Sequence, residues 1–223
     1  MFVRVPSRRK PRPPLATYAL VLLSVASFVA WVMQDPSAQQ LWMQRFGVVP
    51  ERLVAMAASR PAHVLPSLLT ALFVHASWVH LVGNLVFLLA FGVTAERLLG
   101  ARRLMALYLL CGMLANAAGA ALLSNSTTAL IGASGAVSAL VGAYAALFPR
   151  ARLGLVLPLG AFVEFVRVPA YALIGLWVLV QLLMYALGSA GTAVAWPVHI
   201  AGFVFGVIFA WTSRSAIARR LRN

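Results

Sequence analysis

The chain has 223 residues, of which 62% are hydrophobic and 10% charged, with a mean hydropathy of +0.91 and a formal net charge of +14 at pH 7. A water-soluble domain of this size could not bury so much apolar surface, so the composition favours a protein that lies in a lipid bilayer. The single cysteine, Cys111, excludes a disulfide framework and a cysteine metal site. The basic residues are dispersed between apolar segments, so we expect no nucleic-acid partner despite the charge.

Six apolar segments are interpreted as membrane spans. They cover roughly residues 16–33, 79–99, 103–123, 134–148, 167–187 and 196–213. A helix needs about 20 apolar residues to cross a hydrocarbon core of about 30 Å, and the fourth segment is shorter than that. The sequence therefore predicts an all-α polytopic membrane protein, with a six-helix domain over 16–213 between basic tails at 1–15 and 214–223.

The basic residues are distributed unevenly between the two sides of these spans. They precede the first span, lie between the second and third and between the fourth and fifth, and follow the sixth. Only Arg45, Arg52 and Arg60 fall on the other side. The positive-inside rule then predicts that both termini are cytoplasmic, and the absence of a cleavable signal pattern favours the cell (inner) membrane.

Two segments between spans are unusually apolar. Residues 34–77, on the outer side, combine hydrophobic residues with four prolines, and we expect them to form short helices half-buried in the outer leaflet. Residues 149–166, on the inner side, are interrupted by Pro149, Pro158 and Gly160, which predicts a hydrophobic loop.

Ser134 begins the fourth span, between Gly132 and Gly135. A serine at a helix start is usually an N-cap, but Gly132 permits a turn that other residues resist and Gly135 leaves space around the hydroxyl. The N–H of the serine, at a helix N-terminus, can stabilise a developing oxyanion. The G-x-S-x-G elbow of α/β-hydrolases is excluded because residue 136 is alanine and no strand precedes it. Ser134 is therefore a candidate nucleophile.

His199 lies in the sixth span, on one helical face with Gly202 and Gly206. The glycines allow a neighbouring helix to approach closely, and we expect that neighbour to be the helix that Ser134 opens. A histidine inside a membrane can simply bond to another helix, but beside a serine it is a candidate general base. No acidic residue is in a position to orient it, so the sequence predicts a dyad.

His80 and Asn84 are four residues apart and share a face of the second span. They are a poor metal site without a carboxylate or thiolate, so we expect no metal and interpret them as oxyanion donors together with the Ser134 N–H. His80, Ser134 and His199 all fall near the outer ends of spans that run in the same direction, so the topology itself brings them to one depth. For His75, we expect hydrogen bonds that anchor the loop entering the second span.

Taken together, these motifs resemble the rhomboid family of intramembrane serine proteases. The matching segments, in the order of the family, are His75-Ala-Ser-Trp-Val-His80-Leu-Val-Gly-Asn84, Phe91-Gly-x-x-x-Glu96, Gly132-Ala-Ser134-Gly135 and His199-x-x-Gly202-x-x-x-Gly206. The resemblance implies a six-helix bundle around a water-filled cavity that opens to the outer side. It implies Ser134 as nucleophile, His199 as base, and His80 and Asn84 as oxyanion donors, without a cofactor.

The resemblance also implies substrates that are single-span membrane proteins, cut in or near the span. Two departures stand out: Pro66 and Ser67 occupy positions where many relatives carry Trp-Arg, and Ser138 stands where some relatives have an aromatic residue stacked on the base. The alternative is a rhomboid-like protein that binds membrane helices without cutting them. A transporter is disfavoured because the spans lack the carboxylates and paired broken helices typical of that class.

Overall fold

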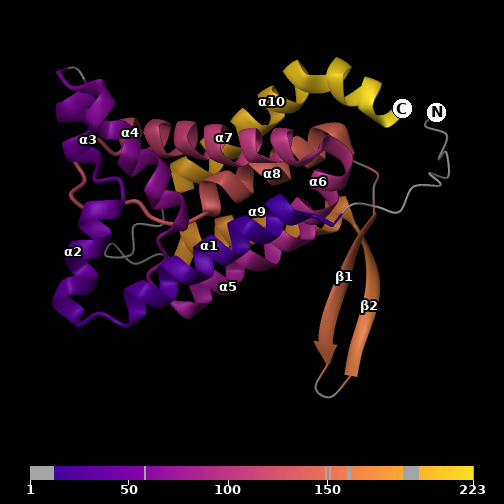
Figure 1. Ribbon diagram of the computed structural model, residues 1–223, viewed down its shortest axis with the longest axis horizontal. Helices are drawn as coiled ribbons and strands as arrows, with labels where there is room; N and C mark the ends of the chain where they lie inside the picture. Colours follow the sequence, from indigo (N-terminus) through magenta and orange to yellow (C-terminus); the bar gives the residue numbers. More distant parts are fainter. Residues whose placement is uncertain are drawn as a thin grey trace.

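The computed structural model describes residues 13–57, 59–148, 150, 152–159, 162–187 and 196–222, so most of the expected tail at 1–15 lies outside the described residues. The elements are α1 (Leu15–Val32), α2 (Pro36–Phe46), α3 (Pro50–Ala57), α4 (Pro61–Thr70), η1 (Ala71–Phe73), α5 (Trp78–Phe87), η2 (Leu88–Gly92), α6 (Val93–Leu99), α7 (Ala101–Leu122), α8 (Ser134–Leu147), β1 (Arg152–Leu159), β2 (Phe162–Pro169), α9 (Ala170–Leu187) and α10 (Trp196–Arg222). The long helices lie side by side, with α2 and α3 at one end of the bundle and the β1–β2 hairpin at the other (Figure 1).

The expected spans differ in length. Four described helices are long and apolar enough to cross a membrane: Leu15–Val32, Trp78–Leu99, Ala101–Leu122 and Trp196–Arg219. The second of these runs through α5, η2 and α6, and η2 is a short π-helical segment within it. The fourth and fifth expected spans correspond to shorter apolar helices, Ser134–Leu147 and the described apolar part of α9 over Ala170–Val180. The protein is thus mostly helical, and a count of six spans stays a prediction.

The prediction of a hydrophobic loop at 149–166 was wrong, and the all-α prediction does not hold for this region. Strands β1 and β2 pair antiparallel, from Arg152 opposite Pro169 to Leu159 opposite Phe162. The segment is rich in valine and phenylalanine, which favour strands, and Pro158 lies one pair from the end of the ladder, where its missing N–H disturbs little. The following helix begins at Ala170, three residues later than the sequence suggested.

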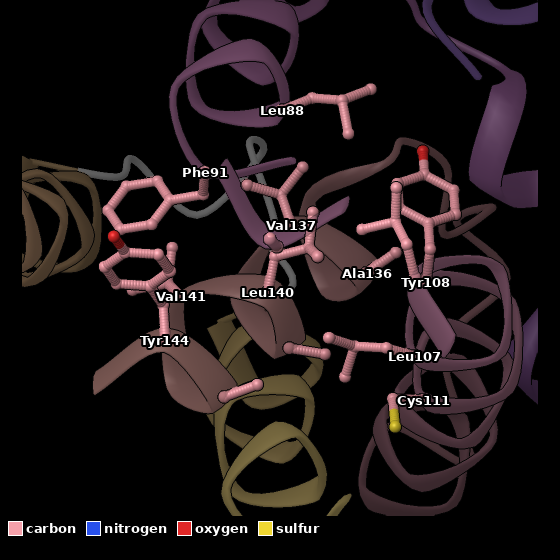
Figure 2. Packing of buried hydrophobic residues seen from close by; sticks show 14 of the residues in the cluster. Leu88, Phe91, Leu107, Tyr108, Cys111, Ala136, Val137, Leu140, Val141 and Tyr144 are labelled. Atoms are coloured by element: carbon pink, nitrogen blue, oxygen red, sulfur yellow. The ribbon is translucent and has the colours of Figure 1, made fainter. Parts of the chain in front are cut away.

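Helix α8 is the central helix of the bundle. Ten consecutive residues, from Gly135 to Tyr144, are buried. Figure 2 shows side chains from the second span and from α7 packed around it. The labelled members of this cluster are Leu88, Phe91, Leu107, Tyr108, Cys111, Ala136, Val137, Leu140, Val141 and Tyr144. A helix buried on all its faces holds its first residue, Ser134, against rigid surroundings.

Helix α10 approaches α8 through its two glycines. A Cβ atom at Gly202 would meet the carbonyl oxygen of Gly135 and lie 3.0 Å from its carbonyl carbon. A Cβ atom at Gly206 would meet the carbonyl oxygen of Ala139 and lie 2.7 Å from its carbonyl carbon. Real Cβ atoms essentially never come that close to a backbone, so this approach requires glycine at both positions.

The segment expected to hold short helices, 34–77, folds as α2, α3, α4 and η1, and its depth in the outer leaflet stays a prediction. It contacts the loop that precedes Ser134. Val48 and Leu130 exchange two backbone hydrogen bonds of 3.0 and 2.7 Å, and the Gly132 N–H donates to the carbonyl of Ala71 at 2.9 Å. These bonds hold the loop at Leu130 and at Gly132, just before α8 begins.

The Trp-Arg departure is accommodated by other bonds within this segment. Ser67 Oγ donates to the carbonyl of Val64 at 2.9 Å, and Thr70 Oγ1 bonds to the carbonyl of Phe46 at 2.6 Å. Asn116, buried on α7, donates from Nδ2 to the carbonyl of Leu68 at 3.1 Å. The outer segment is therefore tied to itself and to α7 without the tryptophan and arginine of many relatives.

Candidate functional site

Ser134 and His199 are brought together at the start of α8. The Nε2 atom of His199 lies 2.7 Å from Ser134 Oγ, which is hydrogen-bonding distance. His199 is 8% exposed and Ser134 half-buried. Ser134 is the first residue of α8, so its N–H belongs to the first-turn donors that lack an intrahelical acceptor. A hydroxyl, an imidazole and a helix N-terminus therefore meet at one point.

Gly132 allows the ring of His80 to approach the loop that precedes Ser134. Its φ is +113°, a backbone conformation that favours glycine, and a Cβ atom there would lie 2.5 Å from His80 Nε2. The ring of His80 thus lies against the backbone two residues before Ser134. The structure brings His80 beside the serine loop, as the sequence predicted for a donor at this site, while its role stays a prediction.

His75 contacts the same loop. The Ala133 N–H donates to Nε2 of His75 at 3.4 Å, and Nδ1 lies 3.2 Å from the carbonyl of Phe73. Because a backbone N–H can only donate, Nε2 must be unprotonated and Nδ1 must carry the hydrogen. Burial lowers the pKa of His75 to about 4, and the nearby His80 acts in the same direction. The loop-anchoring bonds expected for His75 are observed, and their acceptor role requires a neutral ring.

Asn84, the last of the expected site residues, bonds to its own helix. It is 7% exposed, and its Nδ2 donates to the carbonyl of His80 at 2.9 Å, within its own helix. An amide nitrogen carries two hydrogens, so one donor remains beyond this bond. The structure therefore puts Asn84 next to His80, with one hydrogen engaged within α5.

Ser138 occupies the position where some relatives have an aromatic residue. Its Oγ donates to the carbonyl of Ser134 at 2.6 Å, and its Cβ lies 3.2 Å from where a Cβ atom of Gly202 would be. This small side chain lets α10 approach α8 at the level of the dyad. Close helix packing and the hydrogen bond to Ser134 therefore both act on His199.

The sequence interpretation missed residues that shape the site from a distance. Gly119 on α7 contacts Val198, the residue before His199, and Val48 and Ala71 hold the serine loop. The spacing of Gly119 from Asn116 and Gly112 on one helical face was a signal for close packing, whereas nothing local marks Val48 or Ala71.

Within the described part of the chain, no group of three or more His, Cys, Asp or Glu side chains is close enough to hold a metal ion. The pair of Ser134 and His199 has the geometry of a nucleophile and a base, and the ring of His80 lies against Gly132, two residues before the serine.

Comparisons with known proteins agree with these observations. Residues 62–216, most of the chain, match the rhomboid domain. The chain is 26% identical to "Rhomboid protein 1, mitochondrial" of Saccharomyces cerevisiae, over 95% of this chain and 57% of the yeast protein. It is 25% identical to "Rhomboid-related protein 2" of Mus musculus, over 94% of this chain and 67% of the mouse protein. With a domain match of this extent, the chain belongs to the rhomboid family.

Proposed function

We propose that this protein is an intramembrane serine endopeptidase, which hydrolyses peptide bonds in or near the transmembrane segments of membrane-protein substrates. The observation that carries the proposal is the 2.7 Å contact between His199 Nε2 and Ser134 Oγ at the N-terminus of α8. Membership of the rhomboid family supports it. Burial of a serine and a histidine inside a membrane protein costs desolvation free energy, and a catalytic role would explain why the pair is there.

The proposed reaction begins when Ser134 Oγ attacks the carbonyl carbon of the substrate, and Nε2 of His199 takes the hydroxyl proton. The peptide oxygen becomes an oxyanion, which the Ser134 N–H and the imidazole of His80 would stabilise, with Asn84 as a third donor. The intermediate then collapses and expels the amine, which takes the proton from His199. A water, deprotonated by His199, hydrolyses the acyl-serine and restores the enzyme.

The substrate must present an extended segment to the site. In a helix each carbonyl is hydrogen-bonded and shielded, so attack requires that the substrate helix unwind locally. The dyad lies at the end of the bundle that carries α2, α3 and α4, near the N-terminal ends of α8 and α10. A segment that unwinds near the membrane surface would reach this end more easily than one held at mid-membrane depth.

We further propose a cell (inner) membrane location with both termini cytoplasmic and the active site opening to the outer side. The distribution of arginine supports this orientation. Arg97, Arg102 and Arg103 lie at the α6–α7 junction. His80 lies at the other end of the second span, in the first turn of α5. The end of the bundle near the dyad carries fewer basic residues.

Covalent labelling with a fluorophosphonate probe tests the proposal without knowledge of a substrate. The detergent-solubilised wild type should be labelled at Ser134, and both Ser134→Ala and His199→Ala should lose labelling while they keep their thermal stability. Ser37→Ala, which removes an exposed hydroxyl on α2, is the matched control and should label like the wild type. A folded wild type that resists the probe would favour a rhomboid-like protein that binds helices without cutting them.

A further inference from the structure

The residue next to the proposed base is unusually confined. Val198 is 3% exposed, lies in the first turn of α10, and packs in a cluster with Ala115 and Ala120 of α7. It immediately precedes His199, so the two side chains point about 100° apart around the helix axis. While His199 faces Ser134, Val198 faces α7 and the start of α8.

Two glycines form the slot that receives Val198. A Cβ atom at Gly119 of α7 would meet Cγ2 of Val198 and lie 3.3 Å from its Cβ. A Cβ atom at Gly135 of α8 would lie 2.8 Å from Cγ1 of the same valine. Each methyl group of Val198 therefore fills the space left by one missing side chain, so the fit involves three helices.

This fit acts where α10 is least constrained by its own hydrogen bonds. The first turn of a helix has no preceding turn to bond to, so tertiary contacts must determine its position. Valine is β-branched and has one strongly preferred rotamer in a helix, so a fixed pair of methyl groups fixes the backbone that carries them. The hydroxyl of Ser138, one turn after Ser134, donates to the carbonyl of Ser134 within α8, and its side chain is small, so the placement of the imidazole draws on other contacts of α10.

We propose that Val198, seated between Gly119 and Gly135, is the positioning residue that sets the imidazole of His199 at hydrogen-bonding distance from Ser134. The inference rests on the proposed function, since it assigns to this contact the placement of the base. It makes Gly119, on a helix that contributes no reacting group, a determinant of the reaction rate. Val198 itself touches no reacting atom.

The test is a double-mutant cycle on Gly119→Ala and Val198→Ala, read as the rate of fluorophosphonate labelling of Ser134. Gly119→Ala inserts a methyl group where Cγ2 of Val198 lies and should displace the start of α10. Because a displacement of about 1 Å can cost about 100-fold, we expect the maximal labelling rate to fall between about 10- and 100-fold, with the apparent affinity for the probe unchanged. Val198→Ala alone should cost about 10-fold or less.

The double variant should recover most of the lost rate, because the alanine at 198 vacates the space that the new methyl group needs. Gly112→Ala is the matched control on the same helix: its Cβ would lie 2.8 Å from Ala136 Cβ and 2.9 Å from Leu72 Cδ2, and its three nearest atoms belong to these two residues and not to Val198. It should lower the thermal unfolding midpoint, and Val198→Ala should not restore it. A general loss of packing would give the same outcome in both pairs.

Two results would overturn the inference. A double variant as slow as the product of the single effects would mean that Gly119 and Val198 are not coupled through the base. If Val198→Ala restored the Gly112→Ala and Gly119→Ala variants equally, the smaller side chain at position 198 would only relieve crowding in general. In either case, a labelled wild type and an unlabelled Ser134→Ala would leave the proposed function standing, whereas an unlabelled wild type would overturn both proposals.

Discussion

The glycines at the α8–α10 interface and those on α5 and α9 differ in the space that surrounds them. At Gly202 and Gly206 of α10, an added Cβ atom would meet the backbone of α8. At Gly83 of α5 and Gly175 of α9, no atom of the described residues lies within 4 Å of where that Cβ atom would be. The first pair is required by packing, and the second pair lies beside open space, which for helices of this kind would be lipid.

The proposed site draws on both regions. Ser134 and His199 come from the tightly packed pair, whose backbones fix their separation at 2.7 Å. His80 and Asn84 come from α5, where Trp78, Val79 and Val82 are more than half exposed. The proposed reacting groups are thus held by close backbone contact between two helices, while the expected oxyanion donors share one face of α5.

The largest expected effect separates the two regions directly. Gly206→Ala should destabilise the protein by about 3 kcal/mol or more, because the new methyl group would overlap the backbone of Ala139, which cannot move out of the way like a side chain. Thermal unfolding in detergent, monitored as the loss of folded protein with temperature, measures this. A variant with the wild-type midpoint would mean that α10 can shift away from α8 at little cost.

Acid should weaken the contact between the outer segment and the serine loop. His75 has a pKa of about 4 in the fold and 6.5 when unfolded, so the unfolded state binds more protons between these values, and stability falls as the pH drops from about 6.5 to about 4. The full shift corresponds to about 3 kcal/mol. His75→Gln keeps an acceptor for the Ala133 N–H but does not titrate, so its unfolding midpoint should depend less steeply on pH than that of the wild type.

The comparison for this prediction is the slope and not the absolute midpoint. Parallel curves for the wild type and His75→Gln between pH 7 and 5 would show that the acid sensitivity arises elsewhere, with His80, which contacts His75, as the first group to test.

Removal of Asn84, an expected oxyanion donor, should cost less than removal of the dyad. Asn84→Ala should lower the rate of substrate cleavage by about 100-fold or less, about 2.7 kcal/mol at most, because the Ser134 N–H and His80 would still bind the oxyanion. The rate is measured with the same preparation in which Ser134→Ala is inactive. An Asn84→Ala variant as inactive as Ser134→Ala would assign Asn84 a different task.

The smallest effect is expected in the open region. Gly83→Ala and Gly175→Ala should leave labelling unchanged and should shift stability by about 1 kcal/mol or less, in the stabilising direction, since alanine favours the helix and no neighbour obstructs its methyl group. A strong loss of stability at either position would mean that a partner covers that face in the membrane.

The parts of the site that follow from topology could be predicted from sequence. Three polar residues near the same ends of three parallel segments, His80, Ser134 and His199, were expected at one depth, and the structure brings them together. The hairpin at 152–169 was not anticipated, because an apolar segment with prolines has no period that separates a strand pair from a loop. Its strands form only through pairing with each other.

The sequence by itself determined the membrane environment, the helices and the face that Gly202 and Gly206 form, because hydropathy and helical period are local properties of the chain. Only the tertiary structure decided which residues meet: the side chain of Val198 between Gly119 and Gly135, and the backbones of Val48 and Ala71 against the serine loop. These contacts join residues more than fifty positions apart, and no local pattern encodes them. The Val198 contact arises because the close packing of three helices leaves one space that fits one side chain, and the other two are backbone hydrogen bonds that form only once the folded chain brings the two segments together.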